Sequence, residues 1–179
     1  MRRYFYLEYA EDEALGVGYA LNGTDLFLLA EGQYYDNWRT VTFILRDGEY
    51  SDYLANDLGW PLCSRKLRDV LSGSASSVDS IQWLNAQVAH PSGETREYHI
   101  LHLPMRPDVL DGEKTIYAAK GFVVKPCLRP DAIGNHAVFS YPGTTVHVIV
   151  AERVRDAIVS AGCTGIDFSL VSLSRTDFD

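Results

Sequence analysis

The chain has 179 residues, enough for one medium-sized domain with its own hydrophobic core. Hydrophobic residues make up 46% of it and charged residues 22%, an ordinary composition for a soluble globular protein. The formal net charge of −8 argues against a nucleic-acid-binding protein, because such a protein needs a basic face for the phosphates.

The number and spacing of the cysteines and the lengths of the apolar runs indicate the cellular compartment of the protein. Cys63, Cys127 and Cys163 are far apart and odd in number, so a secreted disulfide scaffold is not expected. The chain begins like a signal peptide, but Glu8 and the acidic residues after it arrive before an adequate apolar run. No stretch approaches the roughly 20 apolar residues that span a bilayer. We therefore expect a cytoplasmic protein without a membrane partner.

Strand patterns dominate the N-terminal part. Residues 3–9 alternate and carry aromatic side chains, which predicts a strand, and the acidic run Glu11–Glu13 predicts a loop. Residues 25–30 form a short apolar run of strand length. The β-branched and aromatic run at 40–45 predicts a further strand, and Asp47-Gly48 predicts the turn that ends it.

A helix is predicted after Ser64. The Ser64 hydroxyl can accept a hydrogen bond from a backbone N–H of the first turn, which makes this residue the expected N-cap. Leu67, Val70 and Leu71 then fall on one face of the helix. Gly73 lies in a Ser/Gly-rich run and is expected to close it.

The rest of the chain predicts extended segments joined by loops. In chain order, strands or extended segments are expected at 81–88, 96–103, 115–119, 121–125, 137–140, 145–150 and 165–171. The first two of these read as a hairpin across Pro91-Ser92-Gly93. A loop is expected at 106–112, a short turn at 128–130 and a frayed polar tail from 174.

The helix and the strand after it occur twice in the sequence. Leu67-Arg68-Asp69-Val70-Leu71 aligns with Val154-Arg155-Asp156-Ala157-Ile158, and Trp83 in the following strand aligns with Phe168. Any amphipathic helix followed by a strand resembles another, but the shared Arg-Asp at the same helical phase favours a degenerate repeat. In the second copy Ala151 stands in place of Ser64, and Gly162 is expected to end the helix.

The expected fold is therefore α+β, mainly antiparallel sheet with two equivalent helix-then-strand units. These units span about residues 60–88 and 148–173. No Pro/Gly/Ser linker is long enough to divide the chain, so we expect a single domain over residues 1–179.

The sequence contains no recognised catalytic, cofactor or metal motif. His99-x-x-His102 has a spacing found in metal sites, but residues three apart on a strand point to opposite faces. There is no zinc-type Cys/His cluster, no phosphate-binding glycine loop and no nucleophile motif. Cys63 precedes a helix N-terminus, where a thiol pKa can fall, yet its apolar surroundings favour packing. We expect no metal, no cofactor and no catalytic residues.

One segment combines carboxylates with aromatic side chains. This combination suits a protein-binding surface, because aromatic residues anchor a partner and charges steer a basic one. Paired carboxylates also suit acid–base catalysis, and a plain solvated loop has the same composition. The candidate binding residues are Asp47, Glu49, Tyr50, Asp52, Tyr53 and Asp57. The acidic loop Glu11–Glu13 is the next candidate.

Two sequence blocks resemble those of a bacterial immunity-protein family of polymorphic toxin systems. Residues 59–71 are similar to the family block "P-L-V-S-x-x-L-x-x-h-L", where h is any apolar residue. Residues 148–158 and 162–168 are similar to its closing block "V-S-x-x-h-K/R-x-A-h … G-h-T/S-G-h-x-F". Cys63 replaces the usual Val and Ala151 the usual Ser. The resemblance covers about residues 48–173 and is weak before Arg46.

The resemblance implies a cytoplasmic antidote without enzymatic activity, which binds and neutralises a cognate bacterial toxin domain. Because the chain is acidic, we expect a toxin with a basic face, whose substrate cleft the antidote enters as a substrate mimic. Two alternatives stay open. One is an uncharacterised enzyme that uses the carboxylates between Asp47 and Asp57, and the other is a protein-binding adaptor unrelated to toxins.

Overall fold

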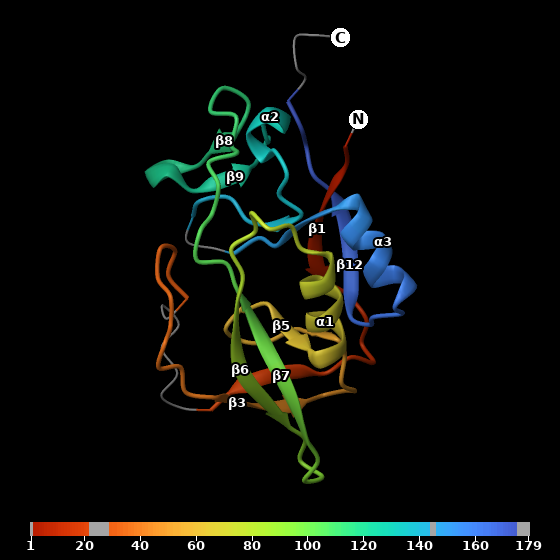
Figure 1. The fold of residues 1–179 in the computed structure, drawn as a ribbon. Helices are drawn as coiled ribbons and strands as arrows, with labels where there is room; N and C mark the ends of the chain where they lie inside the picture. The colour runs from red at the N-terminus through yellow and green to blue at the C-terminus, as the bar shows by residue number, and fades with distance from the viewer. Residues whose placement is uncertain (1, 22–28, 144–145, 175–179) are drawn as a thin grey trace.

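The computed structural model describes residues 2–21, 29–143 and 146–174 (Figure 1). Within these ranges the chain forms two larger β-sheets, a two-stranded sheet and three α-helices. All strand pairs but one within the sheets are antiparallel, which confirms the predicted α+β class. The strand predicted at 25–30 falls mostly outside the described residues.

The N-terminal strand lies inside the four-stranded antiparallel sheet, which has the order β10-β11-β1-β12. Its strands are β1 (Tyr4–Tyr9), β10 (Val138–Phe139), β11 (Ile149–Ala151) and β12 (Ile166–Leu170). Side chains of a strand alternate between its two faces. Accordingly Phe5 and Leu7 pack into the core beneath the helices, while Tyr4 and Tyr6 pack on the opposite side of the sheet.

The second sheet has six strands in the order β2-β3-β6-β7-β5-β4. Its strands are β2 (Val17–Ala20), β3 (Val41–Arg46), β4 (Tyr53–Leu54), β5 (Leu62–Ser64), β6 (Gln82–Ala89) and β7 (Thr95–His102). The β6–β7 pair is the predicted hairpin, and it extends beyond the body of the molecule (Figure 1). The parallel pair is β3 with β6.

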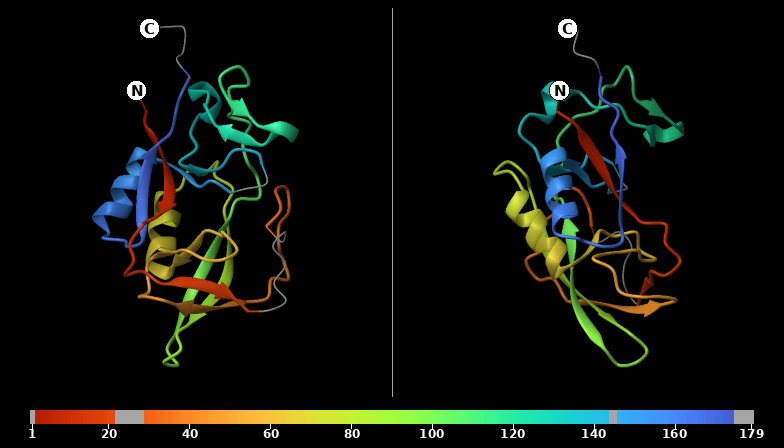
Figure 2. Two further views of the ribbon diagram at one scale, coloured as in Figure 1. Left: turned by 180° about the vertical axis from the view of Figure 1, so that it is seen from behind. Right: turned by 90° about the vertical axis from the view of Figure 1, so that its right-hand side faces the viewer.

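The two longer helices pack side by side. Helix α1 (Arg65–Ser74) buries Leu67 and Leu71, and helix α3 (Glu152–Ser160) buries Val154 and Ile158. Both helices contribute these side chains to one core that also takes residues from both larger sheets. The two views of Figure 2 show the helices next to each other against the sheets. The two units therefore share one hydrophobic core.

Each of these helices connects two parallel strands that have a third, antiparallel strand between them. Helix α1 runs from β5 to β6, with β7 between, and helix α3 runs from β11 to β12, with β1 between. In the first unit Cys63 and Asn85 both pair with His99, and in the second Val150 and Leu170 both pair with Phe5.

This register makes Cys63 equivalent to Val150 and Trp83 equivalent to Phe168, as the sequence alignment predicts. Both segments are thus a helix followed by a strand in the same arrangement. That the two units arose by duplication stays a prediction.

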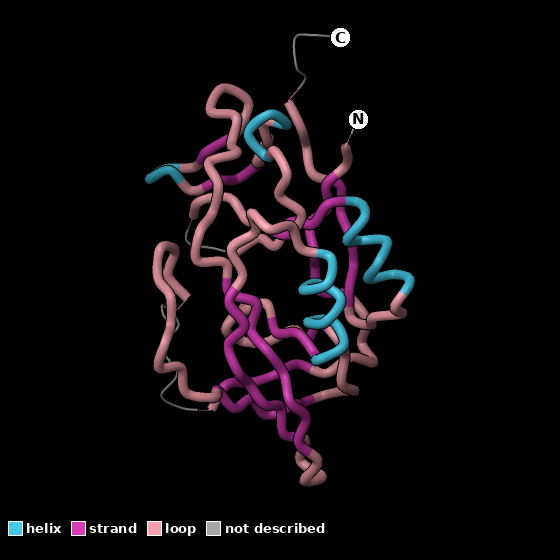
Figure 3. The backbone as a smooth tube through the Cα atoms, in the orientation of Figure 1, coloured by secondary structure: helices cyan, strands magenta, loops and turns pink. Residues whose placement is uncertain are grey.

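A third layer covers the other face of the four-stranded sheet. It contains the hairpin of β8 (Ile116–Tyr117) and β9 (Val123–Lys125), a 3₁₀ turn (Ala119–Gly121) and the short helix α2 (Pro130–Ile133). Loops form most of this layer (Figure 3). Val109, Leu128 and Ile133 bury their side chains against Tyr4 and Phe139, which fixes the layer to the sheet.

Several predicted boundaries were wrong. Gly73 lies inside α1, which ends at Ser74, and the turn predicted at 128–130 leads into helix α2, where Pro130 occupies the first helical position. The strand predicted at 145–150 is shorter and runs from Ile149 to Ala151. Strand β2 was not predicted, because Gly16 just before it and Gly18 within it indicate a loop.

Candidate functional site

The predicted binding segment runs from the end of β3 to the turn before β5, next to the acidic loop Glu11–Glu13. The backbone N–H of Gly16 donates to Glu49 O (2.8 Å), and that of Glu49 donates to Ala14 O (2.9 Å). Gly48 allows this approach, since a Cβ there would lie 2.5 Å from the Leu15 carbonyl carbon. The fold therefore joins the first and the second candidate segments into one surface.

The acidic loop borders a pocket of about 500 Å³. Its lining includes the three acidic residues Glu11, Asp12 and Glu13 and the aromatic residues Tyr9 and Tyr53. The side chains of Asp47 and Glu49, on the neighbouring turn, are exposed to solvent. We call the five exposed carboxylates Glu11, Asp12, Glu13, Asp47 and Glu49 the acidic rim.

Asp57 and Tyr50 are each partly held by the fold. Asp57 is exposed, and its Oδ1 accepts a hydrogen bond from Ala20 N (2.9 Å). The Tyr50 hydroxyl donates to Glu94 O (3.1 Å), and the Arg96 guanidinium lies 3.9 Å from the centre of its ring. Tyr50 is half-buried, so only part of the ring can reach a partner.

Asp52 holds three parts of the chain together. Its carboxylate accepts hydrogen bonds from Ser64 Oγ (2.6 Å) and Thr164 N (2.9 Å), and Lys66 Nζ lies 3.5 Å away. Burial alone would raise the pKa of Asp52, but the bonds from Ser64 and Thr164 and the Lys66 charge more than offset it, so the pKa is lowered. Only 15% of the side chain is exposed. Asp52 therefore fixes the start of α1 to the loop before β12.

Tyr53 is a core residue. It is 4% exposed, and its ring stacks on that of Tyr9 with 4.4 Å between the centroids. Burial, together with Tyr9 and Cys63, raises the pKa of Tyr53 well above its usual value. A partner can touch this ring only through the pocket wall it shares with Tyr9.

The two histidines with metal-like spacing contact different parts of the fold. His99 Nε2 lies 2.9 Å from an Arg68 nitrogen on the helix side of β7, and His102 Nε2 lies 2.7 Å from Gln33 O. Arginine cannot accept a hydrogen bond, so His99 Nε2 accepts and the ring is neutral. No group of three or more potential metal ligands occurs among the described residues.

Cys63 is buried without exposure, and burial raises the pKa of its thiol well above the usual value. It is therefore a packing residue and not a reactive thiol. Among the helices of the described ranges, none has the length and apolar character needed to cross a membrane.

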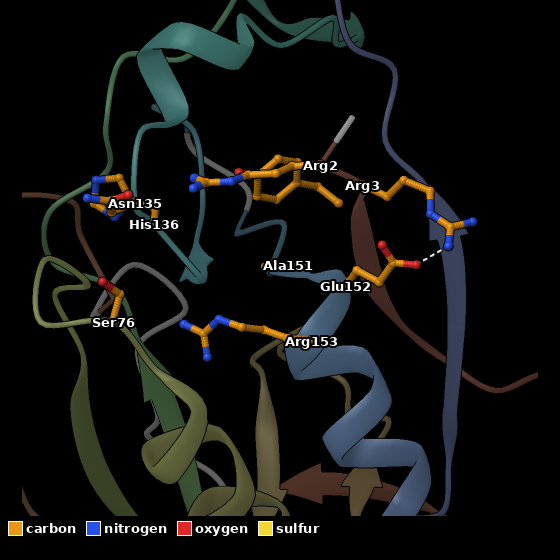
Figure 4. Close-up of a pocket in the computed structure, with 9 residues that line it drawn as sticks. Arg2, Arg3, Ser76, Asn135, His136, Ala151, Glu152 and Arg153 are labelled. Atoms are coloured by element: carbon orange, nitrogen blue, oxygen red, sulfur yellow. Dashed lines mark hydrogen bonds and ion pairs between the residues drawn. The ribbon is translucent and has the colours of Figure 1, made fainter.

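A second pocket, of about 430 Å³, lies at the N-terminus of α3 (Figure 4). Its lining is basic: Arg2, Arg3, Tyr4, Ser76, Asn135, His136, Ala151, Glu152 and Arg153. The sequence does not reveal it, because its residues come from four separate segments, two of which the pairing of β1 with β11 brings together. The one local signal was the absence of a side-chain cap at Ala151.

Comparison with protein families matches the chain to the model of the immunity protein family (Imm11) over residues 31–172. No curated protein sequence matches the chain. The matched range contains the binding segment, helices α1 and α3 and both similar sequence blocks, and it begins after the acidic loop. The chain belongs to the Imm11 immunity protein family.

Proposed function

We propose that this chain binds a cognate bacterial toxin domain and neutralises it in the cytoplasm, as a single immunity-type domain over residues 1–179. Membership of an immunity protein family supports this role. The action is binding and not catalysis. The toxin stays inactive for as long as the complex lasts, so slow dissociation matters most.

The main support for this particular binding surface is that the fold brings two acidic segments together. Glu11–Glu13 and Asp47–Glu49 are remote in sequence, yet they meet at the Leu15–Glu49 bridge beside a pocket of about 500 Å³. No ion pair involves the acidic rim among the described residues. Like charges gathered without counter-charges repel each other, and a basic partner relieves that repulsion.

The proposed partner surface is therefore basic, like the substrate cleft of a toxin that attacks nucleic acids or nucleotides. Complementary charge raises the association rate and restricts which toxins bind. Tyr50 and Asp57 lie at the border of the proposed binding surface and remain part of it. We assign Asp52 and Tyr53 a supporting role there, because their side chains are engaged within the fold.

The alternative of an enzyme that uses the carboxylates between Asp47 and Asp57 has less support. Asp52, the most buried of them, uses its two oxygens on Ser64, Thr164 and Lys66. A general base needs a free oxygen within reach of the proton it removes. We therefore favour binding.

The direct test uses the toxin domain encoded by the neighbouring reading frame. We expect co-expression of the wild-type chain to restore growth of cells that make this toxin. The variant E13K/E49K changes two exposed side chains of the acidic rim and leaves Asp52 intact. Its association rate constant at low salt should fall about tenfold, and the difference should shrink as salt screens the charges.

The matched control is E113K/D108K, which makes the same change in net charge on exposed residues between β7 and β8. Its association rate should stay close to that of the wild type. If both double variants behave like the wild type at both salt concentrations, the toxin binds another face. If the wild-type chain neither binds this toxin nor protects cells, the proposed function itself is refuted.

A further inference from the structure

The basic pocket at the N-terminus of α3 is unusual in a chain with a formal net charge of −8. Its lining contains the guanidinium groups of Arg2, Arg3 and Arg153 and the single carboxylate of Glu152. It is also separate from the acidic rim, since the two pockets share no lining residue. This local reversal of charge indicates a ligand other than the basic partner.

Glu152 does not neutralise the whole pocket. Its carboxylate pairs with Arg3 and lies 3.7 Å from Arg155, on the side of the pocket away from His136 (Figure 4). Arg2, above, and Arg153, below, extend from the same side of the pocket toward Ser76, Asn135 and His136 (Figure 4). Two guanidinium groups therefore border the same cavity without a carboxylate partner among the described residues.

Backbone contacts hold both of these arginines in place. Arg2 donates one N–H to Gly134 O (2.8 Å), and Arg153 donates one to Ser74 O. A guanidinium has five N–H donors in a planar fork, so each arginine keeps donors for a ligand. Oriented donors bind a planar oxyanion with a smaller loss of side-chain entropy.

The end of helix α3 adds to the positive potential. The N-cap residue Ala151 makes no side-chain cap, whereas Ser64 accepts from Leu67 N (3.2 Å) at the equivalent position of α1. The N–H of Glu152 donates to Arg3 O (3.1 Å), and the Ala151 side chain caps no further amide of the first turn. Helix N-termini favour negative charge through these amides and the helix dipole.

We infer that this pocket binds an oxyanion, a carboxylate or phosphate group held between Arg2 and Arg153. This inference does not depend on the proposed toxin face. Two sources supply the same chemistry: a phosphate-bearing small molecule and an acidic side chain of a partner protein. The test therefore uses one probe for each source.

The experiment titrates the full chain with inorganic phosphate and, separately, with N-acetylaspartate, and follows the backbone amide NMR signals at constant ionic strength. We expect saturable shifts at residues 2–3, 135–136 and 152–154. The probe with the higher affinity identifies the source. Shifts that are spread over all basic residues, or that do not saturate with either probe, would overturn the inference.

Three variants of the pocket and one control variant make the result specific. R2A and R153A should each weaken binding about tenfold, because each removes charge-assisted hydrogen bonds. E152Q should strengthen binding, since it removes the only carboxylate of the lining. R39A, a change of an exposed arginine outside the pocket, should leave the affinity unchanged. Equal affinities in R153A and R39A would also overturn the inference, and thermal unfolding checks that each variant is folded.

Discussion

The guanidinium of Arg68 lies 2.9 Å from Nε2 of His99, and this contact connects α1 to the central strand of its unit. In the other unit the Arg155 guanidinium lies 4.2 Å from the ring centre of Phe5, the residue equivalent to His99. Each arginine also donates to the aspartate that follows it, at 2.7 Å for Asp69 and 2.6 Å for Asp156. The arginine of each Arg-Asp pair therefore fixes its helix to the sheet, while the aspartate beside it is exposed to solvent.

The first prediction concerns these two contacts. R68A should lower the free energy of unfolding by about 1–3 kcal/mol, because it leaves the buried acceptor of His99 without its donor. R155A should cost about 1 kcal/mol, the usual range for a cation–π contact. Urea denaturation measures both, with R39A as the surface control, expected within about 0.5 kcal/mol of the wild type. Equal stabilities of R68A and R39A would refute this role of Arg68.

The second prediction concerns Gly165, which has a φ of +77° and packs against the binding segment. A Cβ at this position would lie 2.6 Å from Ser51 Cβ and 2.7 Å from Tyr53 O. The steric overlap in G165A should therefore destabilise the fold by about 1–3 kcal/mol. This is in addition to the cost of placing alanine in a left-handed backbone conformation.

Gly162 provides the matched control for this prediction. It has a φ of +63° and no atom within 4 Å of a built Cβ. G162A should cost only the backbone term of about 1–2 kcal/mol. If the two variants have the same urea midpoint, the close approach of Gly165 to Ser51 contributes nothing to stability.

The sequence correctly predicts the features that depend on neighbouring residues, such as a helix cap and the buried face of a helix. Ser64 and the stripe of Leu67 and Leu71 define α1, and the structure confirms the cap and both buried positions. The equivalence of Trp83 and Phe168 also follows from the alignment, because both lie in the strand that follows a helix.

Contacts between remote segments were not predictable from these patterns. The buried position of Tyr53 depends on stacking with Tyr9, and the bonds of Asp52 depend on Thr164. A single sequence does not reveal which loops contact each other. Acidic residues that are exposed to solvent therefore cannot be told from acidic residues that are hydrogen-bonded within the fold. The basic pocket was missed for the same reason, since the pairing of β1 with β11 brings Arg2 and Arg153 to one pocket.

The third prediction concerns pH. Burial lowers the pKa of His99, His102 and His147, and the charge of Arg68 lowers that of His99 further. The unfolded chain, with an ordinary histidine pKa near 6.5, therefore binds protons that the folded chain does not. The contribution of these histidines to stability should be constant above this pH and should fall as the pH decreases below it.

Denaturation at several pH values between neutral and mildly acidic measures this loss. This pH range is separate from the one in which Asp52 titrates. The pKa of Asp52 is lowered from 3.8, so the stability that Asp52 contributes is lost only at more acidic pH. H99Q keeps an acceptor for Arg68 but cannot titrate, and it should reduce the pH dependence. A slope that is the same in H99Q and the wild type would show that His99 takes up no proton on unfolding.

The fourth prediction compares the two helix starts. Ala151 has φ −67° and ψ 155°, close to the −62° and 166° of Ser64, so its backbone already has the geometry of an N-cap. A151S should therefore give α3 the missing side-chain bond and stabilise the fold by about 1 kcal/mol. S64A should destabilise it by at least this amount, because Ser64 also donates to Asp52 (2.6 Å).

A151S also links stability to the basic pocket. A serine hydroxyl that accepts from the first turn of α3 occupies the amide that an incoming oxyanion would use. The variant should therefore be more stable than the wild type in urea and bind phosphate more weakly. S64A serves as the control, since it changes the other helix and should leave phosphate affinity unchanged. A stabilised A151S with unaltered phosphate affinity would show that the arginines alone hold the anion, and an A151S that is not stabilised would show that the end of α3 is already capped.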